Sequence, residues 1–324
     1  MRPGHLIRVG GMAVAIALAA FALPAQAEFK PSRDVEFVIP YGLGGGADLL
    51  ARTLIKIITE EKLVPVSIVA VNKPGGGSAA GVGYVVASKG GDAHTLVLIN
   101  PQTQITPLRV PEAKGWRDMT PVINFMLDDY VVMVAAASPY KTAADLVNFA
   151  KSKPPRTVSV SSAGTADDMA IAVFQAATGI ELNIVRFNSG GEAITAALGG
   201  HVDLVVGNPL EAVGQLQGKA LRALGVMRST RFEGLPDIPT MKEQGIEVAP
   251  FQMWRGVAVP KDTPQDAVAY WQGIMQKVAA TDAFKKYLSD NMAAQETITG
   301  ADFTKFLESQ EALYKDMLAR IGKK

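Results

Sequence analysis

The chain has 324 residues, of which 48% are apolar and 19% are charged. This composition supplies a folded core and excludes a disordered chain, and the length allows one large domain or two of ordinary size. The 32 basic and 31 acidic residues nearly cancel, so no bulk charge favours nucleic acid or an anionic membrane as a partner. Cysteine is absent, which excludes disulfide scaffolds, thiolate metal sites, thiol catalysis and a lipidated N-terminal cysteine.

The first 27 residues have the pattern of a secretory signal peptide. Arg2 and Arg8 precede the apolar run Met12–Leu23, and the A-x-A sequence Ala25–Ala27 follows it. The run is shorter than the about 20 apolar residues that a membrane span needs. A buried N-terminal helix is the alternative. We expect cleavage after Ala27 and a soluble mature chain in a bacterial periplasm.

The mature chain then alternates short apolar segments with segments of helical periodicity. In its first part we expect strands at Val35–Ile39, Val66–Val71 and Thr95–Ile99, and helices at Ala47–Lys62 and Ala79–Ser88. This β-α-β-α-β succession predicts a parallel sheet with helices on both faces.

A second β/α set of similar size follows. We expect its strands at Val131–Ala136, Val158–Ser161, Asn183–Phe187, Val202–Val206 and Leu221–Val226, and its helices at Ala143–Lys151, Met169–Thr178 and Ala193–Leu198. A late strand at Phe251–Val259 and helices at Gln265–Ala280 and Asp302–Arg320 end the chain. We therefore predict an α/β protein of two lobes, with residues 28–130 and 252–324 in the first and residues 131–251 in the second. The chain is expected to cross between them near Leu127–Val134 and Pro250–Trp254.

Three glycine-containing loops follow predicted strands and precede predicted helices: Gly42–Gly46, Ser162–Thr165 and Ser189–Glu192. The first one, with Ala47, also matches the G-x-G-x-x-A pattern of dinucleotide-binding proteins. An enzyme that binds a nucleotide cofactor at this loop is therefore one hypothesis. Against it, Val71–Lys73 has no acidic residue for a ribose, the chain is exported, and one cofactor does not need three such loops.

The other interpretation of these loops is anion binding. The backbone N–H groups and the positive dipole end at a helix N-terminus favour a negatively charged ligand. Loops facing each other across a cleft would hold the ends of a di- or tricarboxylate, whereas the structural alternative is three tight turns. Asp48, Asp167 and Asp168 fit better as first-turn residues that stabilise their own helices. Arg186 and Arg255 have side chains that either bind a carboxylate or pair with a nearby acid.

The sequence contains few residues that could form a catalytic or metal-binding site. His201 and His94 are far apart in sequence and neither has the partners of a catalytic or metal-binding histidine. No G-x-S-x-G sequence is present. Asp128 and Asp129 have no calcium-loop spacing around them and are expected near a lobe crossing, solvated or paired. Trp254 is expected either to wall the cleft or to pack the lobe interface. We therefore expect no cofactor, no metal and no catalysis.

The loops, in their order along the chain, resemble those of the substrate-binding receptors of tripartite tricarboxylate transporters, also called Bug-type receptors. The segments that carry the resemblance span the mature chain: Pro40–Asp48 with Ala51-Arg52, Asn72–Gly77, Ser189–Ala193, Gly199–Asp203, Leu221–Leu224, Leu235–Thr240, Glu243–Gly245 and Trp254–Gly256. The Gly-Gly-Glu-Ala and Trp-Arg-Gly sequences are most similar to the tricarboxylate-type branch.

The resemblance implies a class II periplasmic-binding-protein fold whose two lobes close over a small carboxylate. It also implies delivery of that carboxylate to an integral-membrane permease, and we expect the receptor to be a monomer. A signalling role would need the same cleft. Carried over to this sequence, the resemblance implies a set of ligand-binding loop residues: Tyr41, Leu43, Gly44, Gly45, Ala47, Asn100, Ser162, Ala163, Gly164, Thr165, Phe187, Ser189, Gly190 and Asn208. Members of the family often have a histidine where Asp167–Met169 stands here, so the resemblance leaves the carboxylate unnamed.

Overall fold

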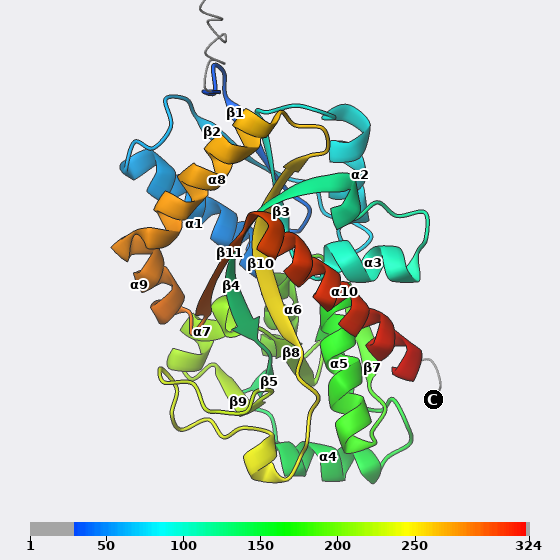
Figure 1. The fold of residues 1–324 in the computed structure, drawn as a ribbon. Helices are drawn as coiled ribbons and strands as arrows, with labels where there is room; N and C mark the ends of the chain where they lie inside the picture. The colour runs from blue at the N-terminus through cyan, green and yellow to red at the C-terminus, as the bar shows by residue number, and fades with distance from the viewer. Residues whose placement is uncertain (1–28, 322–324) are drawn as a thin grey trace, which may run out of the picture.

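The computed structural model describes residues 29–321. The expected signal peptide and its cleavage site lie outside these residues. The described chain forms two α/β lobes, each built on one mixed β-sheet, and Figure 1 shows them one above the other. Within residues 29–321 no helix is both long and apolar enough to cross a membrane.

The first lobe contains a six-stranded sheet with the order β11-β4-β10-β3-β1-β2. Strand β1 pairs in parallel with β2 and β3, whereas β10 is antiparallel to β3 and β4. The strands are β1 (Val35–Ile39), β2 (Ile68–Asn72), β3 (Thr95–Ile99), β4 (Met119–Asp129), β10 (Gln252–Pro260) and β11 (Ala294–Thr299). The helices that accompany them are α1 (Gly46–Glu60), α2 (Ala79–Ser88), α3 (Gln102–Arg109), α8 (Gln265–Ala280) and α9 (Asp282–Asp290), with a 3₁₀ turn at Trp116–Asp118.

The second lobe contains a five-stranded sheet with the order β7-β6-β8-β5-β9. Strand β6 is parallel to β7 and β8, and β5 is antiparallel to β8 and β9. The strands are β5 (Val131–Ala135), β6 (Ser159–Ser162), β7 (Asn183–Arg186), β8 (Leu204–Gly207) and β9 (Leu221–Val226). The helices are α4 (Ala143–Lys151), α5 (Thr165–Thr178), α6 (Gly190–Leu198) and α7 (Pro209–Gln217), and a 3₁₀ turn follows at Lys242–Gln244.

The two sheets repeat one arrangement. In each, three parallel strands are followed by an antiparallel strand that enters from the other lobe: β10 in the first sheet and β5 in the second. Only Tyr130 separates β4 from β5, and β10 begins directly after Phe251. Because helices follow the parallel strands at the edge facing the other lobe, their N-termini meet between the sheets.

The last helix, α10 (Gly300–Ile321), joins the two lobes a second time. Its Tyr314 is fully buried in the core of the second lobe with Tyr130 and Phe251, and the Tyr314 hydroxyl accepts a hydrogen bond of 3.1 Å from Trp254 Nε1. Phe303, near its start, packs in the first lobe against Trp254. Figure 1 shows α10 running from the first sheet to a position beside α5. Trp254 of β10 therefore packs against α10.

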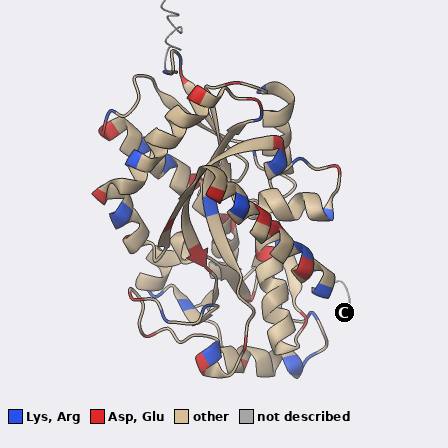
Figure 2. Ribbon diagram, in the orientation of Figure 1, with Lys and Arg blue, Asp and Glu red and all other residues tan. Residues whose placement is uncertain are grey.

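The structure confirms most predicted elements, and it confirms that the first three strands pair in parallel, since β1 is parallel to β2 and to β3. The complete first sheet is mixed because β10, β4 and β11 join it with antiparallel pairings, and an apolar run reveals a strand but not its direction. Helices α5 and α6 begin at Thr165 and Gly190, earlier than the expected Met169 and Ala193, since the first turns of both helices lack the apolar periodicity on which the prediction relied. The elements that sequence patterns missed are α3, β4, α7, α9 and β11. Charges of both signs are interspersed over both lobes (Figure 2), in agreement with the balanced composition.

Candidate ligand-binding site

A cavity of about 480 Å³ lies between the lobes, and we call it the outer cavity. On the first-lobe side its walls come from Tyr41, the glycine loop before α2, and α3. On the second-lobe side they come from the loop before α5 and the end of β7. Its volume is in the range of small-molecule sites. Its polar and charged lining residues include Gln102, Thr106, Arg109, Thr165, Asp168, Arg186 and Asn188.

Two arginines and one aspartate dominate the charge of the outer cavity. Asp168 Oδ2 accepts a hydrogen bond of 2.9 Å from Arg109 Nη1 and another of 2.9 Å from Arg186 Nη2. Its other oxygen, Oδ1, accepts from the Ser162 hydroxyl at 2.8 Å. Since each guanidinium has five N–H donors and gives one to Asp168, both arginines retain donors for a carboxylate. The three side chains together have one net positive charge.

The lobes touch around this cavity. The Gly42 N–H donates to Asn188 O at 3.1 Å, and the Thr106 and Thr165 hydroxyls lie 3.0 Å apart. The Arg109–Asp168 ion pair also joins α3 to α5. These contacts connect first-lobe loops to second-lobe loops, so the structure represents a closed arrangement of the two lobes.

Deeper between the lobes lies a second space of about 30 Å³, which we call the inner cavity. It is bordered by the N-termini of α1 and α6 and by polar side chains from both lobes, which include Asn100, Asp167, Asn208, Glu211 and Arg255. Its size suits a water molecule and is far too small for a dicarboxylate.

A charge cluster surrounds Arg255 beside the inner cavity. Arg255 is 2% exposed and pairs with the fully buried Asp128 at 3.0 Å. The same nitrogen, Nη2, donates to Asn208 Oδ1 at 3.2 Å. Burial raises the pKa of Asp128 to about 7, although the Arg255 charge opposes the rise. Asp129 pairs with Arg228 at 3.1 Å. Both acids are thus paired at the crossing between β4 and β5, as expected, and neither is solvated.

The first-turn acids of α1 and α5 turn back onto their own loops. Asp48 accepts hydrogen bonds from Gly44 N–H at 3.1 Å and from Arg52 and Asn72 side chains. Although burial opposes ionisation, these bonds lower the pKa of Asp48. Asp167 accepts from Ala163 N–H at 2.8 Å. The structure confirms the expectation that Asp48 serves its own helix.

The predicted site residues divide between the two cavities. Tyr41 and Ala163 line both, and Gly164, Thr165 and Phe187 line the outer cavity. Those beside the inner cavity are Gly45, Ala47, Asn100, Ser189, Gly190 and Asn208. Leu43, Gly44 and Ser162 border neither. Leu43 is 65% exposed, and the Ser162 hydroxyl is committed to Asp168. The binding roles of these residues stay predictions.

Sequence patterns missed Arg109 and Glu211. Arg109 ends α3, a helix with a largely polar sequence that gave no apolar periodicity. A signal for Glu211 was present: Pro209 is a favoured first residue of a helix, and it places Glu211 in the first turn of α7 after strand β8. This is the same strand-loop-helix succession that carries the three glycine loops.

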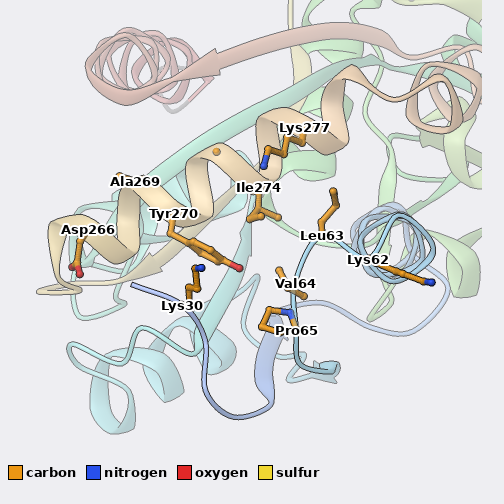
Figure 3. Close-up of a pocket in the computed structure, with 11 residues that line it drawn as sticks. Lys30, Lys62, Leu63, Val64, Pro65, Asp266, Ala269, Tyr270, Ile274 and Lys277 are labelled. Carbon is orange, nitrogen blue, oxygen red and sulfur yellow. The ribbon is translucent and has the colours of Figure 1, made fainter. Parts of the chain in front are cut away.

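A further cavity of about 900 Å³ lies away from all of these residues. Figure 3 shows Tyr270 and Ile274 of α8 beside Lys30 and the segment Leu63–Pro65. Lys30, Lys62 and Lys277 at its rim are exposed. This groove belongs to the first lobe alone and contains none of the predicted site residues.

Comparison with known proteins gives relatives along almost the whole chain. A protein encoded in the gbd 5′ region of Cupriavidus necator is 31% identical over 301 residues, which cover 88% of this chain and 85% of the relative. BugT of Bordetella pertussis is 27% identical over 83% of this chain and 84% of its own length.

Solved structures share the fold. One described as a periplasmic transporter has a TM-score of 0.82 at 27% identity and covers 89% of this chain and 97% of its own. Two Rhodopseudomonas palustris proteins have TM-scores of 0.79: one determined with adipate at 23% identity, and MatC with bound malate at 21%. They cover 90% and 89% of this chain and 98% and 99% of their own.

The model of the tripartite tricarboxylate transporter family receptor matches residues 51–323. This match includes the whole second sheet and every strand of the first sheet except β1, and it agrees with the resemblance carried by the loops that follow Ala51. The chain therefore belongs to the tripartite tricarboxylate transporter receptor family, whose members are substrate-binding receptors and not enzymes.

Proposed function

We propose that this receptor binds a small di- or tricarboxylate in the outer cavity, closes over it and delivers it to the permease of a tripartite tricarboxylate transporter. The observation that carries this proposal is the pair of arginines that share one aspartate. Arg109 comes from the first lobe and Arg186 from the second, and both line the same cavity. A carboxylate there gains charge-assisted hydrogen bonds from both lobes only when they are closed.

The surroundings of the two arginines suit an anion with polar groups along its length. Tyr41, Ala163, Gly164, Thr165 and Phe187 line this cavity, and we propose them as ligand contacts. The malate and adipate bound by the two structural neighbours are dicarboxylates of the size that this cavity admits. We propose residues 28–130 with 252–324 and residues 131–251 as the closing lobes, and export to the periplasm with cleavage after Ala27.

The hypothesis of a nucleotide cofactor at the first glycine loop receives no support. Asp48 accepts from Gly44 N–H, and Glu211 accepts from Gly46 N–H at 2.5 Å. A phosphate at this loop would meet two carboxylates on the donors it requires, and like charges repel. The physical role of the loop is therefore different from that of a dinucleotide-binding turn.

Thermal unfolding of the mature chain, from Glu28 onward, tests the proposal. Succinate, malate, adipate and citrate are compared with acetate and with the neutral diamide of succinate. At a hundredfold excess over its Kd a ligand of the folded state adds about 2.7 kcal/mol of stability. We expect a rise in Tm with one or more of the polycarboxylates and none with the diamide. A chain that responds to none of them, or equally to the diamide, does not have the proposed function.

Delivery to a permease needs a separate measurement. Cells that lack this receptor should lose uptake of the carboxylate that stabilises it, and a plasmid copy should restore uptake. A chain that binds the carboxylate while uptake remains normal in its absence would instead serve sensing. The bound carboxylate should be recovered unchanged after incubation, since a receptor does not convert its ligand.

A further inference from the structure

Glu211 reaches from one lobe to the other. It lies in the first turn of α7, which belongs to the second lobe, and its Oε1 accepts a hydrogen bond of 2.5 Å from Gly46 N–H. Gly46 is the first residue of α1 in the first lobe. A carboxylate of the chain itself therefore occupies the helix N-terminus at which the first glycine loop was expected to hold a ligand.

The glycines around this carboxylate leave the space for it. A Cβ on Gly190, the first residue of α6, would overlap the Glu211 carboxylate. A Cβ on Gly45 would lie 3.6 Å from Glu211 Oε1. The N-termini of α1 and α6 thus converge on one carboxylate, and the partial positive charge at each end stabilises it.

Arg255 completes the surroundings. Its guanidinium stands so close to α1 that a Cβ on Gly46 would lie 2.6 Å from Nη2. The Arg255 Nε atom is buried and has no hydrogen-bond partner within residues 29–321. Both Arg255 and Glu211 border the inner cavity. A cation beside two helix N-termini is unfavourable by itself, so it requires anions close by. Asp128 pairs with Arg255 directly, and Glu211 is the carboxylate that accepts from the N-terminus of α1 in the same cavity.

We propose that Glu211 is a built-in carboxylate that fills the anion site at the N-termini of α1 and α6 and thereby determines specificity. It confines the carboxylates of the ligand to the outer cavity, an implication that rests on the proposed function. The glycines of the first and third loops then serve the chain's own carboxylate. The ligand is selected by the groups that remain: Arg109, Arg186 and the polar walls of the outer cavity.

Chemical rescue of Glu211→Ala by acetate tests this assignment. Removal of the side chain leaves a vacant site that fits a small carboxylate, so acetate should bind the variant and not the parent chain. At acetate tenfold above its Kd, we expect the Tm of the variant to rise by about 3 °C. Chloride at equal ionic strength controls for salt. Formate is the smaller second probe.

Glu192→Ala is the matched control. Glu192 is also a first-turn glutamate that accepts a backbone N–H, from Asn188 at 3.1 Å, but it is exposed on α6. Acetate should not stabilise this variant, because water already fills the space. Equal responses of the parent, Glu192→Ala and Glu211→Ala, or no response of Glu211→Ala, would overturn the proposal. If Glu211→Ala does not fold, Glu211→Ser with formate is measured by the same criterion.

The proposed role of Glu211 in ligand specificity is tested in the same variant, Glu211→Ala. With the inner site vacant, a polycarboxylate should bind Glu211→Ala with altered preference among chain lengths, and acetate should restore the preference of the parent. Unchanged preference would remove the specificity role. The acetate measurement needs no polycarboxylate, so it decides the occupancy of the inner site even if no polycarboxylate binds the parent and the proposed function fails.

Discussion

The lobes meet at two places, and at each of them arginine side chains lie beside carboxylates. The arginine is buried at the inner place, whereas the arginines are partly exposed at the outer one. At the inner one, Arg255 and Glu211 lie among helix N-termini, and the Arg255 side chain is 2% exposed. At the outer one, Arg109 and Arg186 flank Asp168, and their side chains are 41% and 59% exposed. The inner arginine is enclosed by groups of the chain itself. The outer arginines each give one hydrogen bond to Asp168 and face a cavity large enough for a ligand.

Burial explains the difference. A charge removed from water must be compensated by its neighbours at all times, so the inner arginine needs permanent partners. A half-exposed charge is solvated when no ligand is present and can exchange water for a carboxylate. We therefore regard the inner contact as structural and the outer contact as the place of reversible binding.

The largest expected effect is loss of stability in Arg255→Ala. The substitution leaves Asp128 and Glu211 without their cation, and breaking a buried ion pair costs about 3–5 kcal/mol. Urea denaturation measures the change in the free energy of unfolding. Arg320→Ala is the control, because the Arg320–Asp316 pair is exposed, and it should change stability by less than about 1 kcal/mol. Similar small losses in both variants would contradict the structural role of the inner contact.

The next effect is on affinity. Arg186→Gln and Arg109→Gln should each weaken binding of the stabilising polycarboxylate by about tenfold, since each removes a charge-assisted hydrogen bond. Calorimetric titration gives the Kd. Lys286→Gln on α9 replaces an exposed cation paired with Asp290 and should leave the Kd unchanged. If Arg186→Gln binds as tightly as the parent chain, the carboxylate is held elsewhere.

A smaller effect concerns pH and the inner contact. Burial and the Glu211 charge raise the pKa of Asp167 from its ordinary value of 3.8 to about 7. A carboxyl with a raised pKa in the folded state is fully compatible with folding below pH 4. Its contribution to stability is lost as the pH rises toward 7. Asp167→Asn lacks this titration, so its stability relative to the parent should increase between pH 5 and pH 8.

Chemical denaturation at several pH values measures this difference. Asp145→Asn is the control, because hydrogen bonds from the Lys141 and Thr142 N–H groups lower the pKa of the exposed Asp145. Its contribution is lost only as the pH falls through that lowered pKa, so its difference from the parent should stay constant over the same range. A constant difference for Asp167→Asn would show that this carboxyl is ionised throughout.

The smallest effect is expected from Thr165→Val at the outer contact. The substitution removes the hydroxyl that lies 3.0 Å from the Thr106 hydroxyl across the lobes. One neutral hydrogen bond contributes about 1 kcal/mol, so the Kd should rise about threefold to tenfold with little change in Tm of the free chain. Thr195→Val, which removes an exposed hydroxyl bonded to Gly191 O within α6, should not change the Kd.

Patterns in the amino-acid sequence were enough to predict the class of fold. Apolar runs of four to six residues alternating with helical periodicity predicted β1, β3 and β9, together with α2, α4 and α8, within a residue or two. This succeeds because buried strands and amphipathic helices must carry their apolar residues at fixed spacings. The glycine loops were also visible, since a turn that brings backbone close to another group excludes side chains.

Which groups the glycine loops contact became visible only once the packing of distant elements was known. The glycines at positions 46 and 190 were consistent with a ligand carboxylate, but the structure places Glu211 there instead. Glu211 is 165 residues from Gly46 in the sequence. Arg109 and Arg186 come from separate lobes and share Asp168 only because α3 and β7 end where α5 begins. The spacing of apolar residues along the chain predicts the helix or strand in which a residue lies. The partner of a charged side chain depends on how distant elements pack, and no local pattern encodes that.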